Sequence, residues 1–195
     1  MREAEINRRT KETDICLRLN LDGEGKTVLD TGIGFFDHML DAFSRFGLLD
    51  LAVTCKGDLR VDGHHTVEDV GICLGKALRE ALGDRAGIRR AGSAFLPMDE
   101  ALAFAALDIS GRPFLAFDAD FAGPACGAMD TQLAEEFFRA VCVNAGLTLH
   151  LRVLAGRNDH HKMEALFKAF GLALRDAAAP DPRVKGVPST KGSLD

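Results

Sequence analysis

The pattern of apolar and polar positions predicts five elements in the first half of the chain. An extended apolar segment over 12–23 contains an Asp-Gly turn at its end, and a short second strand follows at 27–29. Apolar residues at helical spacing predict a helix over 35–43, and another strand covers 51–55. The last element is a helix that begins with the sequence HHTVE at 64–68. The order is therefore β-β-α-β-α.

The second half of the chain repeats this order. An extended apolar segment over 100–111 ends in a Ser-Gly turn, and a second strand follows at 113–117. Helical spacing of apolar residues recurs over 133–141, and a strand covers 148–154. The final helix carries the sequence HHKME at 160–164.

The two His-His-x-x-Glu sequences indicate an internal duplication. They lie 96 residues apart, and GKALREA at 75–81 aligns with GLALRDA at 171–177 at the same offset. The first strands align at an offset of 88 and the first helices at an offset of 98, as loop insertions allow. Chance does not readily produce this agreement in register.

These elements predict an α+β fold built from a duplicated β-β-α-β-α unit, with the helices packed on one face of the sheets. The pattern leaves open whether the two sheets join. We assign the first repeat to 1–91 and the second to 92–178. The tail over 179–195 is rich in Pro, Gly and Lys. That composition is typical of an extended or mobile segment that can order on a ligand or a neighbour.

Composition and charge narrow the functional classes. The chain has 195 residues, of which 47% are hydrophobic and 27% charged, as in an ordinary globular protein. A net charge of −5 argues against binding to nucleic acids or membrane surfaces. We find no apolar run long enough to cross a bilayer and no signal-peptide pattern. Five scattered cysteines without a C-x-x-C pair predict free thiols, so we expect a cytoplasmic location.

The repeated motif has the geometry of a metal site. Residues four apart share a face of a helix, so His64 and Glu68 can bind one metal, as can His160 and Glu164. The adjacent histidine in each copy points about 100° away and suits a different metal. The arrangement differs from the H-E-x-x-H of zinc proteases, where both histidines lie on the ligand face. Nitrogen and oxygen ligands without thiolate suit Mn, Fe, Co, Ni or Zn.

Two more residues join the candidates through the repeat. His38 stands at the start of the first predicted helix, and Glu136 occupies the equivalent position in the second half. Both are ligand-type residues, which favours a metal role over that of a half-buried structural histidine.

Two alternatives remain compatible with a metal centre. One is a dinuclear metallohydrolase that uses a metal-bound hydroxide. The other is a metal-storage or scaffold particle. Storage is disfavoured because carboxylate-bridged bundles place Glu-x-x-His on long helices, whereas here the motif is reversed and strands interrupt the helices.

Three blocks carry a resemblance to a known family. TGIGFFDHMLD at 31–41, DGHHTVED at 62–69 and GRNDHHKMEALFK at 156–168 resemble signature blocks of the imidazoleglycerol-phosphate dehydratase family. Three further blocks fit the family in the same order: RRTKETDI at 8–15, PMDEAL at 97–102 and PSTKG at 188–192. The resemblance covers nearly the whole chain.

The resemblance implies a hydro-lyase of histidine biosynthesis that converts D-erythro-imidazole glycerol phosphate to imidazole acetol phosphate. It also implies two Mn2+ per active site, and trimers that assemble into a 24-mer with the metal sites between subunits. Each half is expected to resemble the second domain of ribosomal protein S5.

The resemblance also assigns residues. The implied metal ligands are His38, His64, His65, Glu68, His160, His161 and Glu164. Several members carry an eighth ligand, a histidine, where this chain has Glu136, which can bind through oxygen and adds negative charge. The implied catalytic residues are Glu12, Glu68 and Glu164, with Glu12 as the acid/base group. The implied substrate contacts are Arg90, Arg112, Ser189 and Lys191 at the phosphate, with Asp99 and Lys168 elsewhere in the pocket.

The chemistry agrees with these assignments. The reaction must remove a non-acidic C–H proton and expel hydroxide from the side chain. An imidazolate held by two metals can feed electrons into that side chain through a diazafulvene-like intermediate, and the metals act as Lewis acids. A nearby carboxylate such as Glu12 can then move the proton.

Overall fold

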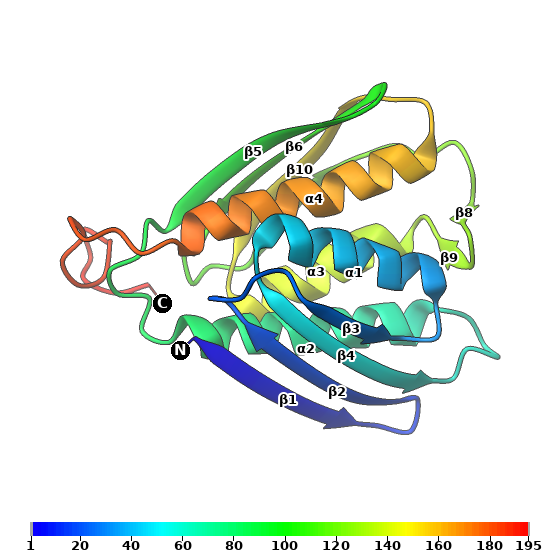
Figure 1. Ribbon diagram of the computed structural model, residues 1–195, viewed down its shortest axis with the longest axis horizontal. Coiled ribbons are helices and arrows are strands. Elements are labelled where there is room, and N and C mark those ends of the chain that lie inside the picture. Colours follow the sequence, from blue (N-terminus) through cyan, green and yellow to red (C-terminus); the bar gives the residue numbers. More distant parts are fainter. Residues whose placement is uncertain (1, 195) are drawn as a thin grey trace.

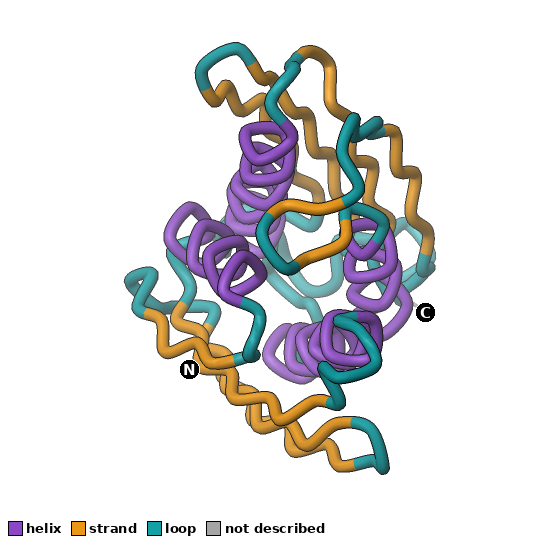
Figure 2. The backbone as a smooth tube through the Cα atoms, turned by 90° about the vertical axis from the view of Figure 1, so that its right-hand side faces the viewer, coloured by secondary structure: helices purple, strands orange, loops and turns teal. Residues whose placement is uncertain are grey.

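Two four-stranded sheets enclose a double layer of helices in the computed structural model, which describes residues 2–194 (Figure 1). Seen from one end, the four long helices of this part of the chain run side by side between the sheets (Figure 2). The sheets remain separate, which settles the question that the sequence pattern left open.

The first sheet has the strand order β1-β2-β4-β3, in which only the β3–β4 pairing is parallel. Its strands are β1 (Glu3–Arg9), β2 (Thr13–Asn20), β3 (Thr27–Asp30) and β4 (Asp50–Gly57). Helices α1 (Gly34–Gly47) and α2 (His64–Leu82) pack on its inner face. Alternation along β2 directs Ile15, Leu17 and Leu19 into the core.

The second sheet repeats this topology in the order β5-β6-β10-β7. Its strands are β5 (Ala91–Met98), β6 (Ala101–Asp108), β7 (Phe114–Asp118) and β10 (Thr148–Ala155). Helices α3 (Leu133–Ala145) and α4 (Asp159–Ala178) cover it. A small hairpin, β8 (Ala125–Cys126) with β9 (Met129–Asp130), lies between β7 and α3.

The structure confirms the duplicated α+β fold and adds one strand to the start of each repeat. The unit is β-β-β-α-β-α because β1 and β5 precede the predicted elements. Along β1, only Ile6 is buried, and along β5 only Leu96. Edge strands of this kind carry a weak apolar pattern, so the alternation in sequence did not reveal them.

Helices of opposite halves pack against each other in the core. α2 lies on α3, and α1 lies on α4. The closest approaches occur at glycines in equivalent positions. A Cβ on Gly75 would lie 2.7 Å from the carbonyl oxygen of Val141 in α3, and one on Gly171 would lie 2.4 Å from that of Phe43 in α1. Only a residue without a side chain fits where the helices come this close.

The tail folds back on its own chain at the end opposite the helix N-termini (Figure 1). The amide of Gly87 donates to the carbonyl of Gly186, and Arg90 donates through Nη1 to the carbonyl of Pro188 at 2.8 Å. Arg85 also donates through Nη1 to the carbonyl of Leu194, so contacts within the chain reach the last described residue. Within the described residues, no helix combines the length and apolar character needed to cross a membrane.

Candidate metal centre and active site

All four helices begin at the same end of the molecule, on the right in Figure 1. The two histidine pairs lie at the starts of α2 and α4, and a side-chain oxygen two residues before each pair fixes the first turn. Asp62 accepts from the amide of His64 at 2.8 Å, and Asn158 accepts from that of His160 at 2.9 Å. Asn158 is the N-cap of α4, and Asp62 lies one residue before the N-cap of α2, so each helix begins on a polar side chain that binds its first turn.

The second-half motif forms a compact group with α1. The carboxylate of Glu164 accepts from Nε2 of His38 at 3.2 Å and from Nε2 of His160 at 3.1 Å. Among the described residues, this is the group whose ligand atoms all lie within 4.8 Å of one another. Two imidazole nitrogens and a carboxylate oxygen are ligands that a borderline divalent metal accepts. The group therefore fits a metal.

A lysine balances the charge of this group. Nζ of Lys168 lies 2.5 Å from the second oxygen of Glu164 and 5.0 Å from the centre of the Phe46 ring. Burial of Glu164 opposes its ionisation, yet the hydrogen bond from Lys168 and the nearby charges hold the pKa of the carboxyl below its ordinary value. The buried glutamate is thus kept anionic, as a metal ligand must be.

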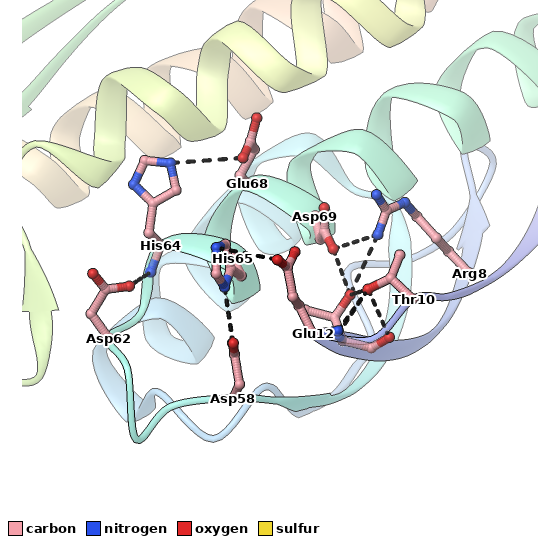
Figure 3. Close-up of polar contacts among 10 residues, drawn as sticks. Arg8, Thr10, Glu12, Asp58, Asp62, His64, His65, Glu68 and Asp69 are labelled. Carbon is pink, nitrogen blue, oxygen red and sulfur yellow. Dashed lines mark hydrogen bonds and ion pairs between the residues drawn. The ribbon is translucent and has the colours of Figure 1, made fainter.

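The first-half motif is more open (Figure 3). Nε2 of His64 lies 3.7 Å from Glu68, and both side chains are exposed by more than two-fifths. Glu136 lines the same cavity of about 730 Å³ as His64 and pairs with Arg139 at 3.4 Å. The structure thus brings Glu136 to the neighbourhood of His64, as the repeat predicts, without closing a compact group.

The second histidine of each pair turns away from the first, with interplanar angles of 82° and 80°. Nδ1 of His65 donates to Asp58 at 3.0 and 3.1 Å, and Nδ1 of His161 donates to Glu100 at 2.7 Å. These hydrogen bonds raise the pKa of each imidazole above its ordinary value. The divergence of adjacent imidazoles agrees with the expectation that neighbours serve different metals.

Glu12 lies at the β1–β2 turn, with its carboxylate 3.8 Å from Nε2 of His65 (Figure 3). Its amide donates to the Thr10 hydroxyl at 3.1 Å. Close by, Asp69 accepts from the hydroxyl of Thr13 at 2.5 Å and pairs with Arg8. This network fixes the backbone of the turn and leaves the Glu12 side chain half exposed.

The residues assigned to the phosphate lie at the opposite end of the molecule, near the C-terminal ends of the helices. Arg90 pairs with Asp108 at 2.7 Å, and its amide donates to the carbonyl of Ala177 near the end of α4. His160 stands at the start of α4, which places it about 25 Å away at ~1.5 Å per residue. Ser189 accepts from the amide of Lys191 in the tail.

The remaining assigned residues divide between the two ends. Arg112 is exposed in the turn after β6, where its amide donates to Ser110. Asp99 lies at the β5–β6 turn, 80% exposed and 3.9 Å from Nε2 of His161. Lys168 and Asp99 thus accompany the histidines, whereas the four phosphate candidates do not.

Sequence reasoning missed Asp58 and Glu100. Glu100 could have been found, because it aligns with Glu12 at the offset of 88 that relates the first strands. Asp58 has no such partner. It lies in the connection between β4 and α2, which is three residues longer than its counterpart between β10 and α4.

Known proteins match the chain over both halves. A sequence model of the family described as imidazoleglycerol-phosphate dehydratase matches residues 31–174. The protein of that name from Acetivibrio thermocellus is 59% identical, with 99% of each chain covered. The one from Symbiobacterium thermophilum is 61% identical, with 99% of this chain and 93% of that protein covered.

Solved structures agree. Imidazoleglycerol-phosphate dehydratase from Staphylococcus aureus superposes with a TM-score of 0.84 at 39% identity, covering 92% of this chain and 99% of that one. The Pyrococcus furiosus protein, in complex with (S)-C348, gives 0.83 at 39% identity, covering 97% and 100%. With the duplicated fold and the metal-type side chains at one end of the helices, these matches show that the chain belongs to the imidazoleglycerol-phosphate dehydratase family of hydro-lyases.

Proposed function

We propose that this protein dehydrates D-erythro-imidazole glycerol phosphate to imidazole acetol phosphate in L-histidine biosynthesis, with two Mn2+ per active site. The convergence of His38, His160 and Glu164 supports the proposal most directly, since His38 on α1 lies 126 residues before Glu164 on α4. We assign the reaction to the cytoplasm, because the five cysteines are free thiols.

Two ligand groups would hold the metals. The α1–α4 side supplies His38, His160 and Glu164, and the α2–α3 side supplies His64, Glu68 and Glu136. His65 and His161 would each bind, through Nε2, a metal other than the one that the neighbouring histidine binds. When bound, a divalent metal supplies Lewis-acid stabilisation of the charge that develops on the substrate imidazole.

Glu12 is the proton-transfer residue of the proposal. Its carboxylate is half exposed and faces Nε2 of His65 from 3.8 Å. An oxygen at this position can take the proton from the second side-chain carbon, which becomes the ketone carbon of the product. The proton then leaves as water with the hydroxide lost from the carbon attached to the imidazole. Lys168 supports the reaction indirectly, since it keeps Glu164 ionised.

The active site of the proposal is completed by a neighbouring subunit. About 25 Å separates the helix starts from Arg90, a distance that the glycerol chain of the substrate cannot span. Arg90, Arg112, Ser189 and Lys191 would therefore reach the phosphate in the site of another copy, where arginine offers bidentate donors. Such sharing supports a homo-oligomer, and we propose the 24-mer built from trimers.

The test is an assay of chelator-treated protein with imidazole glycerol phosphate, with and without Mn2+, together with size-exclusion chromatography. We expect metal-dependent formation of the ketone product and dissociation of the assembly on chelation. Release of inorganic phosphate instead would favour a metallohydrolase. Metal uptake without turnover would favour storage. Full activity without any divalent metal would contradict the proposed centre.

A further inference from the structure

Each half of the molecule holds the second histidine of its pair between two carboxylates. In the first half, Asp58 contacts Nδ1 of His65 and Glu12 faces Nε2. In the second half, Glu100 contacts Nδ1 of His161 and Asp99 faces Nε2. The two arrangements look alike, yet equivalent residues do not play equivalent parts in them.

Glu100 is bound firmly on the Nδ1 side. One of its oxygens lies 2.7 Å from Nδ1 of His161, and the other accepts from the amides of Arg157 and Asn158 at 3.1 and 2.8 Å. A carboxylate saturated in this way is a poor proton carrier and a good anchor.

Glu12 occupies the equivalent position in the first half and lacks these bonds. Its side chain is 53% exposed and lies 3.8 Å from the nearest imidazole nitrogen. Asp58 makes the contact to Nδ1 in its place, and the amide of Asp58 donates to the carbonyl of Glu12 at 3.0 Å. The longer connection between β4 and α2 thus supplies a second carboxylate at the first-half hairpin.

We propose that Asp58 and Glu100 are positioning residues that hold the Nδ1–H of His65 and His161, so that Nε2 of each ring faces the metal, and that Asp58 thereby leaves Glu12 free for proton transfer. The inference rests on the proposed function and deepens it. An ionised carboxylate can only accept a hydrogen bond, so it selects the tautomer whose lone pair is on Nε2. Outer residues of this type orient histidine ligands and tune metal affinity.

The first experiment reads the tautomers without any metal. Solid-state 15N NMR of histidine-labelled, chelator-treated protein resolves the imidazole nitrogens of a chain with six histidines. At a pH where the rings are neutral, we expect two histidines as the Nδ1–H tautomer. Asp58→Asn should release one of them and Glu100→Gln the other, while Asp118→Asn, an exposed carboxylate on β7, should release neither. Spectra that do not change in the two variants would overturn the proposal.

The second experiment separates positioning from proton transfer. Titration with Mn2+ should show about 10–100-fold weaker binding for Asp58→Asn and Glu100→Gln, with kcat largely retained at saturating metal. Glu12→Gln should lose kcat and keep its metal affinity. Equal loss of metal affinity in Glu12→Gln and Glu100→Gln would contradict the division between them.

Different outcomes reject the positioning role and the proposed function, so the two can be distinguished. Wild-type protein that binds no Mn2+, or that binds it and does not dehydrate the substrate, would reject the proposed function. The tautomer measurement would still decide whether Asp58 and Glu100 position the rings.

Discussion

The two halves share one topology and treat their metal-type residues differently. In the second half, Glu164 is buried and within 3.2 Å of two imidazoles. In the first half, Glu68 is partly exposed and 3.7 Å from His64. The duplicated backbone therefore fixes the positions of the metal-type residues along the helices. The side chains around them determine how close together and how buried these residues are in each group.

One difference in sequence between the repeats accounts for much of the contrast between the buried Glu164 and the more open Glu68. Lys168 lies four residues after Glu164 and pairs with it, whereas the equivalent residue after Glu68 is Ile72. A second difference is Glu136 in the place of His38. The group around His64, which takes Glu136 from α3, thus contains two carboxylates and no lysine; the cation beside it is Arg139, which pairs with Glu136 at 3.4 Å.

The largest effect should come from removing a ligand from either half. We expect His160→Ala and His64→Ala each to lower activity by more than about 100-fold, beyond the loss caused by an outer residue, and to weaken assembly. Measured kcat/KM and size-exclusion profiles check this. A fully active, fully assembled single variant would break the view that both halves supply a metal group.

Next in size is the loss of the proton-transfer group. Glu12→Gln should reduce kcat by about 10²–10⁴-fold with little change in KM, because the carboxylate acts on the proton rather than on binding. Thermal unfolding of the metal-free variant should match that of the wild type, since the Glu12 side chain is half exposed. A variant with normal kcat would remove Glu12 from the mechanism.

Adding a single methyl group where the helices of the two halves meet should lower the stability of the protein. Gly171→Ala and Gly75→Ala should each lower the free energy of unfolding by about 1–3 kcal/mol, because the new Cβ meets backbone of the facing helix. Gly34→Ala is the control, since a Cβ at this helical position has nothing within 4 Å. Denaturant titration compares the three. Equal stability of all three variants would show that the helices can move apart freely.

The smallest effect should come from Glu136, which stands where the first half has His38. Glu136→His should leave the enzyme active and shift its metal preference toward metals that favour nitrogen ligands, such as Zn2+ over Mn2+. Competition titrations with the two metals measure the shift. An unchanged preference would count against Glu136 as a ligand.

The sequence predicted the part of this architecture that repeats. The offset of 96 located α2 and α4 and placed Gly75 over Gly171. It did not reveal β1, where Ile6 alone is buried. Apolar periodicity reports burial, so an edge strand with one buried residue leaves little signal.

The candidate site was predicted residue by residue but not as an assembly. His38 and Glu164 are 126 residues apart, and only tertiary packing of α1 on α4 brings them together. The roles of Asp58 and Glu100 depend on which nitrogen each carboxylate meets, which no linear spacing encodes. The separation of Arg90 from the histidines likewise follows from the length of α4.

The pairing of α1 with α4 and α2 with α3 also bears on how such a chain can arise. A single half would expose the helix face that the other half now covers, so alone it would be stable only as a dimer with itself. Joining two copies in one polypeptide turns that dimer interface into an internal one. Mutation can then act on one copy at a time, and equivalent residues such as Glu12 and Glu100 become free to specialise.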